Sequence, residues 1–232
     1  MPLNLNDFLL LFAVGAGAVL LLAVLLRSVR EGMDTLPHGE TLDPGDLKET
    51  GLDEGVAKVL REESGEPAIF EGTKKRTGLA VLPDGASAHA VLARLRERLR
   101  GRATAFLSED KVAAGVPACI VVLAGTDPWQ PLAFMGTRQG AEVAERLRGW
   151  RGRHAFELAG CGDDWVELWF PAPVEDEAFF RDVWDFCPRA ASDAEGGAKS
   201  LMDKVRKEGL MYLWWESESE KAEGRGLRAE GR

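Results

Sequence analysis

The chain has 232 residues, of which 45% are hydrophobic and 29% are charged, and its formal net charge is −9. This composition is that of a globular protein with room for one sizeable domain or two small ones. The net negative charge argues against nucleic acid as a partner, because phosphate contacts require clustered cations. Three widely spaced cysteines, with no close grouping of cysteine and histidine, favour a reducing compartment and predict no structural zinc site. We expect no metal and no cofactor.

The N-terminal segment predicts a membrane anchor. After a short N-terminus, residues 1–7, the next nineteen residues carry no charge, which is enough for a helix across a bilayer. A cleaved signal peptide would need a positively charged start, and a buried core helix would show a polar face. We therefore expect a single transmembrane helix over residues 8–30. Arg27 and Arg30 follow the apolar run, so the positive-inside rule places the N-terminus outside the cell membrane and the C-terminal domain in the cytoplasm.

Residues 31–66 are predicted to be an acidic flexible linker. They contain eleven acidic and three basic side chains, with Gly, Pro and Thr between them, and the first half shows no apolar periodicity. A short helix is expected around residues 56–62. The acidic side chains of this linker would be repelled by an anionic membrane surface, and this repulsion would hold the following domain away from the membrane.

Residues 67–216 are predicted to form the globular domain, and the charged tail, residues 217–232, is expected to be disordered. Alternating or continuous apolar runs predict strands, and apolar residues three and four apart predict helices. In the first part we expect a helix over residues 86–101 and strands over residues 77–83, 103–107, 118–124 and, more weakly, 131–135. In the second part we expect helices over 140–150, 175–187 and 197–209, and strands over 154–158, 164–170 and 210–215.

From residue 131 onward the order is strand, helix, strand, strand, helix in two pieces, strand. This is the ferredoxin-like βαββαβ order. The predicted fold class is therefore α+β, a mixed sheet with helices mainly on one face and ferredoxin-like order in the C-terminal half, preceded by a single N-terminal transmembrane helix.

The sequence contains no assembled catalytic motif. There is no phosphate-binding GxxxxGK[ST] loop, no GxGxxG and no GxSxG. Two alternatives stay open for a hydrolase or transferase. Asp163 and Asp164, in "CGDDW", could bind a cation or act as a base, although Asp and Gly are also the usual residues of a hairpin turn. Cys187 could be a nucleophile if His154 lay beside it, although cysteine is more often a small buried hydrophobe.

The last apolar stretch, "LMYLWWE", divides between two faces if it is a strand. Leu210, Tyr212 and Trp214 then share one face, and Met211, Leu213 and Trp215 share the other. The second set is uniformly apolar and is expected in the core. The first set ends in aromatic side chains with polar groups and is expected to be partly open.

The C-terminal part of the chain resembles an uncharacterised bacterial family, numbered 4253 among the domains of unknown function. The motifs that carry the resemblance lie within residues 135–216: "MGT", "ERLRGW", "DDWVELWFPAP", "FFRDVWDFCP" and "LMYLWWE". This sequence departs from the family pattern after "GT", where Arg138 stands, after "FCP", where Arg189 stands, and at the terminal acid, Glu216. The resemblance implies an α+β fold and no established activity or cofactor.

We therefore expect a membrane-anchored protein whose cytosolic domain binds another protein without catalysing a reaction. The alternatives are the hydrolase or transferase above and a structural membrane protein that assembles with itself. Tryptophan is enriched at binding hot spots, which directs attention to the exposed aromatic positions. The candidate binding surface comprises Thr137, Arg138, Asp163, Asp164, Trp165, Trp169, Tyr212, Trp214 and Glu216.

Overall fold

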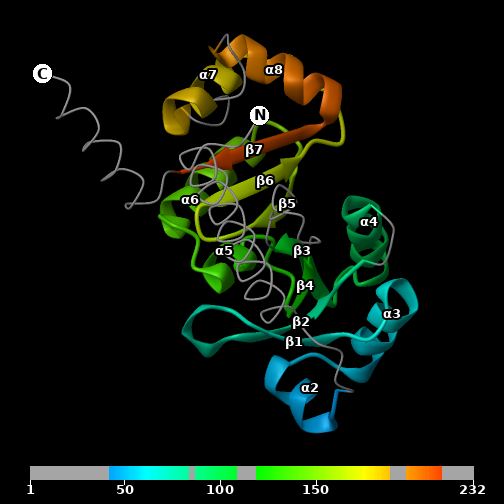
Figure 1. Cartoon of the computed structure of the whole chain (residues 1–232). Helices are drawn as coiled ribbons and strands as arrows, with labels where there is room; N and C mark the ends of the chain where they lie inside the picture. The colour runs from blue at the N-terminus through cyan, green and yellow to red at the C-terminus, as the bar shows by residue number, and fades with distance from the viewer. Residues whose placement is uncertain (1–41, 84–86, 109–118, 189–196, 216–232) are drawn as a thin grey trace, which may run out of the picture. The chain divides into compact units, whose positions relative to one another are not determined.

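The computed structural model describes residues 42–83, 87–108, 119–188 and 197–215, all within one compact unit of the chain, residues 39–232. Their strands form one mixed sheet in the order β1-β2-β4-β3-β5-β6-β7 (Figure 1). Strands β3 and β5 run parallel, and the other neighbouring strands run antiparallel. The strands are β1 (Ala68–Glu71), β2 (Thr77–Val81), β3 (Ala103–Ser108), β4 (Cys119–Ala124), β5 (Glu157–Cys161), β6 (Trp165–Trp169) and β7 (Leu210–Trp214).

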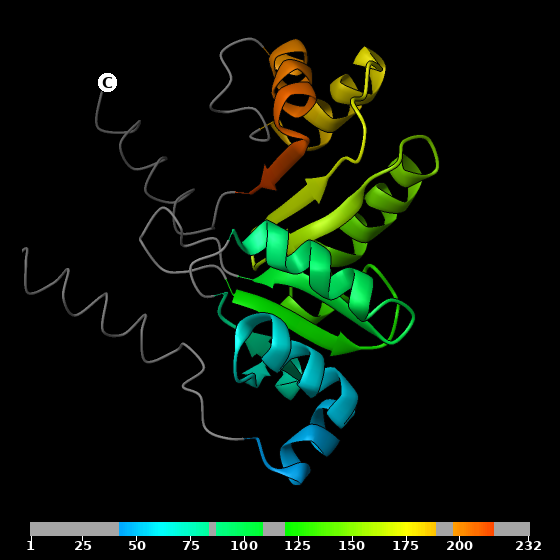
Figure 2. The same cartoon turned by 90° about the vertical axis from the view of Figure 1, so that its right-hand side faces the viewer.

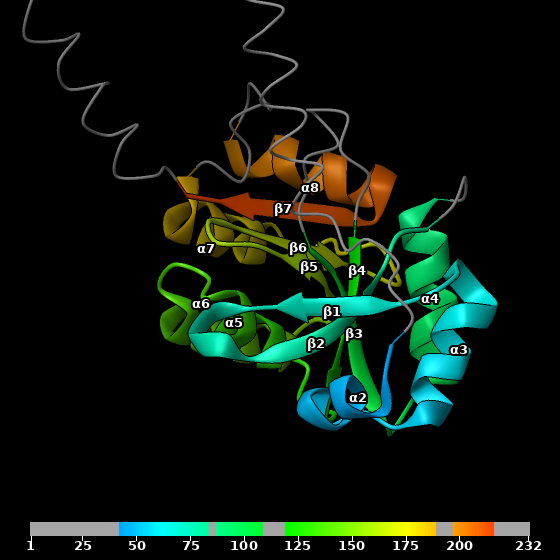
Figure 3. The same cartoon turned by 60° about the horizontal axis from the view of Figure 1, so that its bottom comes forward.

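The described helices lie on both faces of this sheet. Figure 3 shows α3 and α4 on one side of the strands and α5 and α6 on the other. The first group comprises α2 (Pro44–Thr50), α3 (Glu54–Ser64) and α4 (Ala88–Arg98). The second comprises α5 (Gln130–Met135), α6 (Gly140–Arg151), α7 (Glu177–Phe186) and α8 (Gly197–Glu208). A short 3-10 helix, η1 (Thr73–Lys75), joins β1 to β2.

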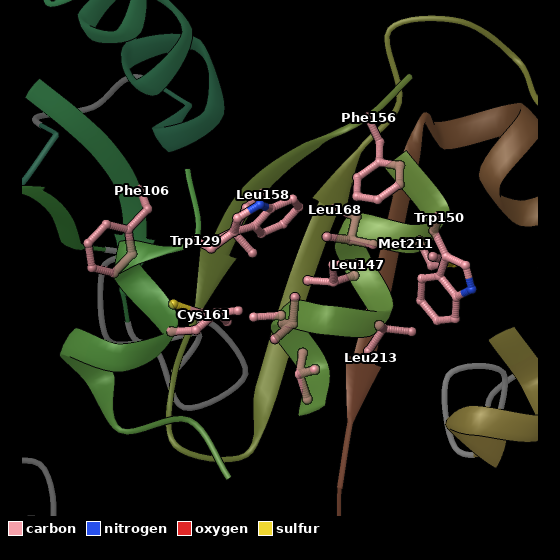
Figure 4. Packing of buried hydrophobic residues seen from close by; sticks show 14 of the residues in the cluster. Phe106, Trp129, Leu147, Trp150, Phe156, Leu158, Cys161, Leu168, Met211 and Leu213 are labelled. Carbon is pink, nitrogen blue, oxygen red and sulfur yellow. The ribbon is translucent and has the colours of Figure 1, made fainter. Parts of the chain in front are cut away.

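The larger hydrophobic core lies between the strands and helices α5 to α8. On α6, Val143, Leu147 and Trp150 recur at helical spacing and are at most 1% exposed. Figure 4 shows Leu147 and Trp150 directed toward side chains of β6 and β7, among them Leu168 and Leu213. Because successive strand residues face opposite sides, the buried side chains of β7 are its alternate ones, as the sequence predicts.

The predicted placement of helices mainly on one face is wrong, and strand composition gives the reason. In β2, Ala80 faces the larger core, whereas Leu79 and Val81 face a second core built with α2, α3 and α4. Strand β4 is likewise buried on both faces. A strand that is apolar on both faces requires cover on both, which is why the first half of the sheet lies between two helical layers.

The predicted ferredoxin-like order is also wrong. Residues 130–135 form helix α5 and not a strand. Pro131 lies in its first turn, where a missing amide costs nothing, and Gly136 ends it in a left-handed conformation with φ of 71°. The strand next to β5 is instead β3, in parallel orientation, so the sheet is one continuous layer across both halves.

The described part of the predicted linker is folded. Residues 44–64 form α2 and α3, each with an aspartate cap: the side chains of Asp43 and Asp53 accept hydrogen bonds from amides in the first turn. Val56 and Leu60 of α3 are buried in the second core, 2% and 0% exposed. The short helix predicted at residues 56–62 lies inside α3. The globular unit therefore begins before residue 67.

The predicted transmembrane helix, residues 8–30, lies outside the described residues. Within the described ranges no helix is both long enough and apolar enough to cross a bilayer. The described residues form a mixed α+β domain with a seven-stranded sheet, which corrects the predicted fold class.

Candidate functional site

The turn between β5 and β6 carries Asp163 and Asp164, and a neighbouring loop holds it in place. The hydroxyl of Thr137, which is 5% exposed, donates to the carbonyl of Gly162 at 2.8 Å. The amide of Arg138 donates to the carbonyl of Asp163 at 2.6 Å. Since β5 and β6 pair antiparallel around this turn, the hairpin interpretation is confirmed. Thr137 and the amide of Arg138 therefore position a turn.

Asp164 also takes part through its main chain, because its carbonyl accepts a hydrogen bond from the amide of Trp215 at 2.8 Å. Among the described residues no three His, Cys, Asp or Glu side chains are grouped so that they could hold a metal ion. Cys161 begins the turn and is buried. Burial raises the pKa of the Cys161 thiol, against an opposing hydrogen bond with Thr137, so this thiol is a poor nucleophile.

Cys187 and His154 contact opposite ends of α7. The Nε2 atom of His154 lies 3.1 Å from Oδ2 of Asp176, the N-cap of that helix. Cys187 is the C-cap, is 1% exposed, and its thiol donates to the carbonyl of Trp214 at 3.3 Å. About eleven residues of helix separate the two ends, or ~16 Å. The structure therefore does not bring this cysteine and this histidine together.

Four of the predicted site residues do share one surface, the face of β6 and β7 opposite helices α5 to α8. Trp165 pairs with Trp214 across the strands, and its ring stacks on that of Tyr212 with centroids 5.5 Å apart. Trp169, at the far end of β6, is 40% exposed. We call these four residues the aromatic face. In Figure 2, α3 and α4 lie in front of the first half of the sheet, and β6 and β7 continue above them.

A groove of about 390 Å³ lies where α4 borders the aromatic face. One wall is α4, and the other is formed by Trp169, Leu210 and Glu208 at the junction of α8 and β7. Ala90, Ala93 and Leu92 of α4 and Ala159 of β5 make most of the lining apolar, and Ser87, His89 and Arg96 contribute polar groups. An apolar groove with a few polar groups is the usual form of a binding site.

The polar groups of the α4 wall bond to the sheet. Nε2 of His89 lies 2.8 Å from Oε1 of Glu167, whose side chain is 14% exposed. Arg96 donates to the main-chain carbonyls of Ala105 in β3, at 2.9 Å, and Leu158 in β5. Burial lowers the pKa of the Arg96 guanidinium, and a charged hydrogen bond to Glu157 opposes that effect. Arginine nevertheless stays protonated in proteins, so Arg96 is a permanent and partly buried charge.

The structure thus separates the predicted residues into two groups. Trp165, Trp169, Tyr212 and Trp214 form the aromatic face. Asp163 and Asp164 lie in the β5–β6 turn, and Thr137 and Arg138 lie in the loop between α5 and α6 that bonds to this turn. Glu216 lies outside the described residues. Sequence reasoning missed His89, Arg96, Glu208 and Leu210 as groove residues, and their spacing carries no local signal, since His89 and Glu167 lie 78 positions apart.

The fold and groove define a mixed α+β domain with one aromatic sheet face next to a groove. The model of the family described as "Domain of unknown function (DUF4253)" matches residues 119–216, so the resemblance predicted from the motifs is confirmed. No curated protein and no solved structure matches the chain. The matched segment contains β4 to β7 and the wall of the groove with Trp169, whereas α4 lies before it.

Proposed function

We propose that the domain binds another protein through the aromatic face and the adjoining groove, without catalysing a reaction. The observation that carries this proposal is Trp169, a large aromatic side chain that is 40% exposed at the edge of an apolar groove. Tryptophan is over-represented among residues that dominate the free energy of protein association, because it covers a large area with little loss of conformational entropy.

The contacts of the candidate catalytic residues favour a binding function over catalysis. The thiol of Cys187 is buried against a carbonyl, and His154 is bonded at the other end of α7. The main chains of Asp163 and Asp164 hold a turn. In the groove, three nitrogens of Arg96 already donate to the sheet and to Glu157. These contacts do not support the hydrolase or transferase alternative.

Site-specific photo-cross-linking in the native host tests this proposal. A photoreactive phenylalanine analogue is placed at Ala93, an exposed residue on the groove wall that faces Trp169, and a matched control at Ala141, an exposed position of α6 on the opposite face. We expect a discrete cross-linked partner at position 93 that is absent at position 141 and that excess unlabelled protein competes away. Identical products at both positions, or none, would contradict the proposal. A product that contains two copies of this chain would instead support the self-assembly alternative.

Attachment to the cell membrane through residues 8–30, with the domain on the cytoplasmic side, stays a prediction from the sequence alone. Its test is separate from the binding experiment. Extraction of membranes with alkaline carbonate should leave the chain in the pellet, and protease added to intact cells should spare the domain. Release by carbonate would contradict attachment by a spanning segment.

A further inference from the structure

Trp169 lies directly against the C-terminal end of helix α8. It pairs with Leu210, the first residue of β7, and the amide of the next residue, Phe170, donates to the carbonyl of Gly209 at 2.8 Å. A β-carbon added to Gly209 would lie 4.0 Å from Nε1 of Trp169. Gly209 ends α8 in a left-handed conformation, with φ of 68°. The indole therefore flanks the helix end where main-chain carbonyls carry the negative pole of the helix dipole.

Glu208 adds a carboxylate at the same place. It is the last residue of α8, is exposed, and lines the groove together with Trp169. An acidic side chain at a helix C-terminus is unfavourable, because it adds to the negative pole. No ion pair or hydrogen bond joins its side chain to another described residue, including Lys204 one turn earlier. Arg206, two positions before it, is paired with Glu175 and Asp203.

The other ionisable side chains that line the groove are bonded to carboxylates. His89 bonds to Glu167, and Arg96 bonds to Glu157. The charge without a partner is thus the carboxylate of Glu208, at the end of the groove that Trp169 forms. The face of an indole ring is itself electronegative and attracts cations. The carboxylate, the helix end and the ring face therefore all favour a positive group there.

We propose that Trp169 and Glu208 bind a lysine or arginine side chain of a peptide segment in the partner protein, while apolar neighbours of that residue occupy the groove beside Ala90, Ala93 and Leu210. This inference rests on the proposed protein-binding function and specifies the chemistry of the partner. A long cationic side chain fits the site because its methylene stem can lie on the indole while its charged end reaches the carboxylate.

Fluorine NMR of the full chain labelled with 5-fluorotryptophan tests the proposal, with the Trp169 resonance assigned from Trp169→Phe. The probe is the peptide acetyl-Ala-Leu-Lys-Leu-Ala-amide, and its comparison peptide carries norleucine, which is lysine's stem without the charge. We expect a saturable shift of the Trp169 resonance with the lysine peptide and binding at least about fivefold weaker with the norleucine peptide. Glu208→Gln should weaken binding of the lysine peptide by about two- to fivefold. The matched control Glu142→Gln, on α6, should leave it unchanged.

Three results would overturn the inference. They are equal binding of the two peptides, no effect of Glu208→Gln, and binding of n-butylammonium as tight as that of the lysine peptide. The last result would indicate that the site binds a small amine and not a peptide. Cross-linking at position 93 in the Glu208→Gln chain separates this inference from the proposed function. If the partner is captured as efficiently as before, protein binding stands and cation recognition fails. If no partner is captured from the native host while the lysine peptide still binds, the cation site stands and the proposed function fails.

Discussion

The two halves of the sheet differ in how their faces are covered. Strands β2, β3 and β4 lie between two helical layers, and the side chains on both of their faces are largely aliphatic and buried. Strands β6 and β7 carry buried Leu and Val on one face and Trp, Tyr and Glu on the other. A sheet that obtains its stability from one packed face can leave the second available for recognition. The difference supports the proposal that the domain binds its partner through the aromatic face.

The match to the family model crosses this division, because it begins at β4, which is covered on both faces. It includes the strands that carry the aromatic face and the α8 end with Glu208, but it begins after α4. The groove therefore combines one wall inside the matched segment with one wall outside it. The cation site proposed above lies on the matched wall, and Ser87, His89 and Ala90 of the other wall would determine which peptide segments fit beside it.

Truncation of the packed face should have the largest effect. Phe179 is fully buried on α7, and its ring lies 5.7 Å from that of Trp150 and 6.2 Å from that of Phe170. Phe179→Ala removes these contacts and leaves a cavity, so we expect a loss of about 3–5 kcal/mol in the free energy of unfolding. Urea unfolding followed by circular dichroism measures it. A loss below about 1 kcal/mol would show that this face does not carry the stability of the second half.

Removal of the hydrogen bonds of Arg96 should have the next largest effect on stability. Strands β3 and β5 share one paired position, Leu107 with Gly160, and Arg96 bonds to a carbonyl of each strand. Arg96→Met keeps the apolar stem and removes the donors, which leaves both carbonyls without this partner. We expect a loss of about 2–3 kcal/mol. The control Arg100→Met, an exposed change close by, should cost less than about 0.5 kcal/mol. Equal losses would contradict a role for Arg96 in joining the two halves.

These residues also show where sequence reasoning ends. The alternation within β7 predicted that Tyr212 and Trp214 share a face, because the period of two is a local property, but only the pairing of β6 with β7 places Trp165 and Trp169 on that same face. The run "PLAFM" fits a strand or a helix, because five apolar residues are too few to show a period. It forms most of α5, which begins at Gln130. Strand β1 and helix α2 are too short to show a period. The groove itself requires α4, β6 and α8 to meet, which no local pattern predicts.

Substitution on the aromatic face should have a smaller effect on stability than on binding. Trp169 is partly exposed, and Trp169→Thr retains a residue suited to a strand. We expect a loss of about 1 kcal/mol in the free energy of unfolding and loss of the partner that is cross-linked through position 93, on the facing wall. Unchanged capture would show that Trp169 is not part of the contact surface, and a loss as large as that of Phe179→Ala would remove the contrast between the two faces.

The smallest expected change in the free energy of unfolding is that of Glu208→Gln, and it is a gain. Glu208→Gln exchanges residues of nearly equal helix propensity at the end of α8 and removes a negative charge from the negative pole of the helix. We expect a gain of about 0.3–0.5 kcal/mol in the free energy of unfolding at low ionic strength, which should shrink as added salt screens the helix end. Urea unfolding at two salt concentrations measures this gain. Glu142→Gln in the first turn of α6, where an acid is favourable, should instead show a loss of stability.

If removing the charge of Glu208 stabilises the fold and weakens binding of the lysine peptide, then Glu208 serves binding and not folding. If Glu208→Gln destabilises the chain instead, Glu208 supports the helix end, and the electrostatic argument for a cation at Trp169 loses its basis.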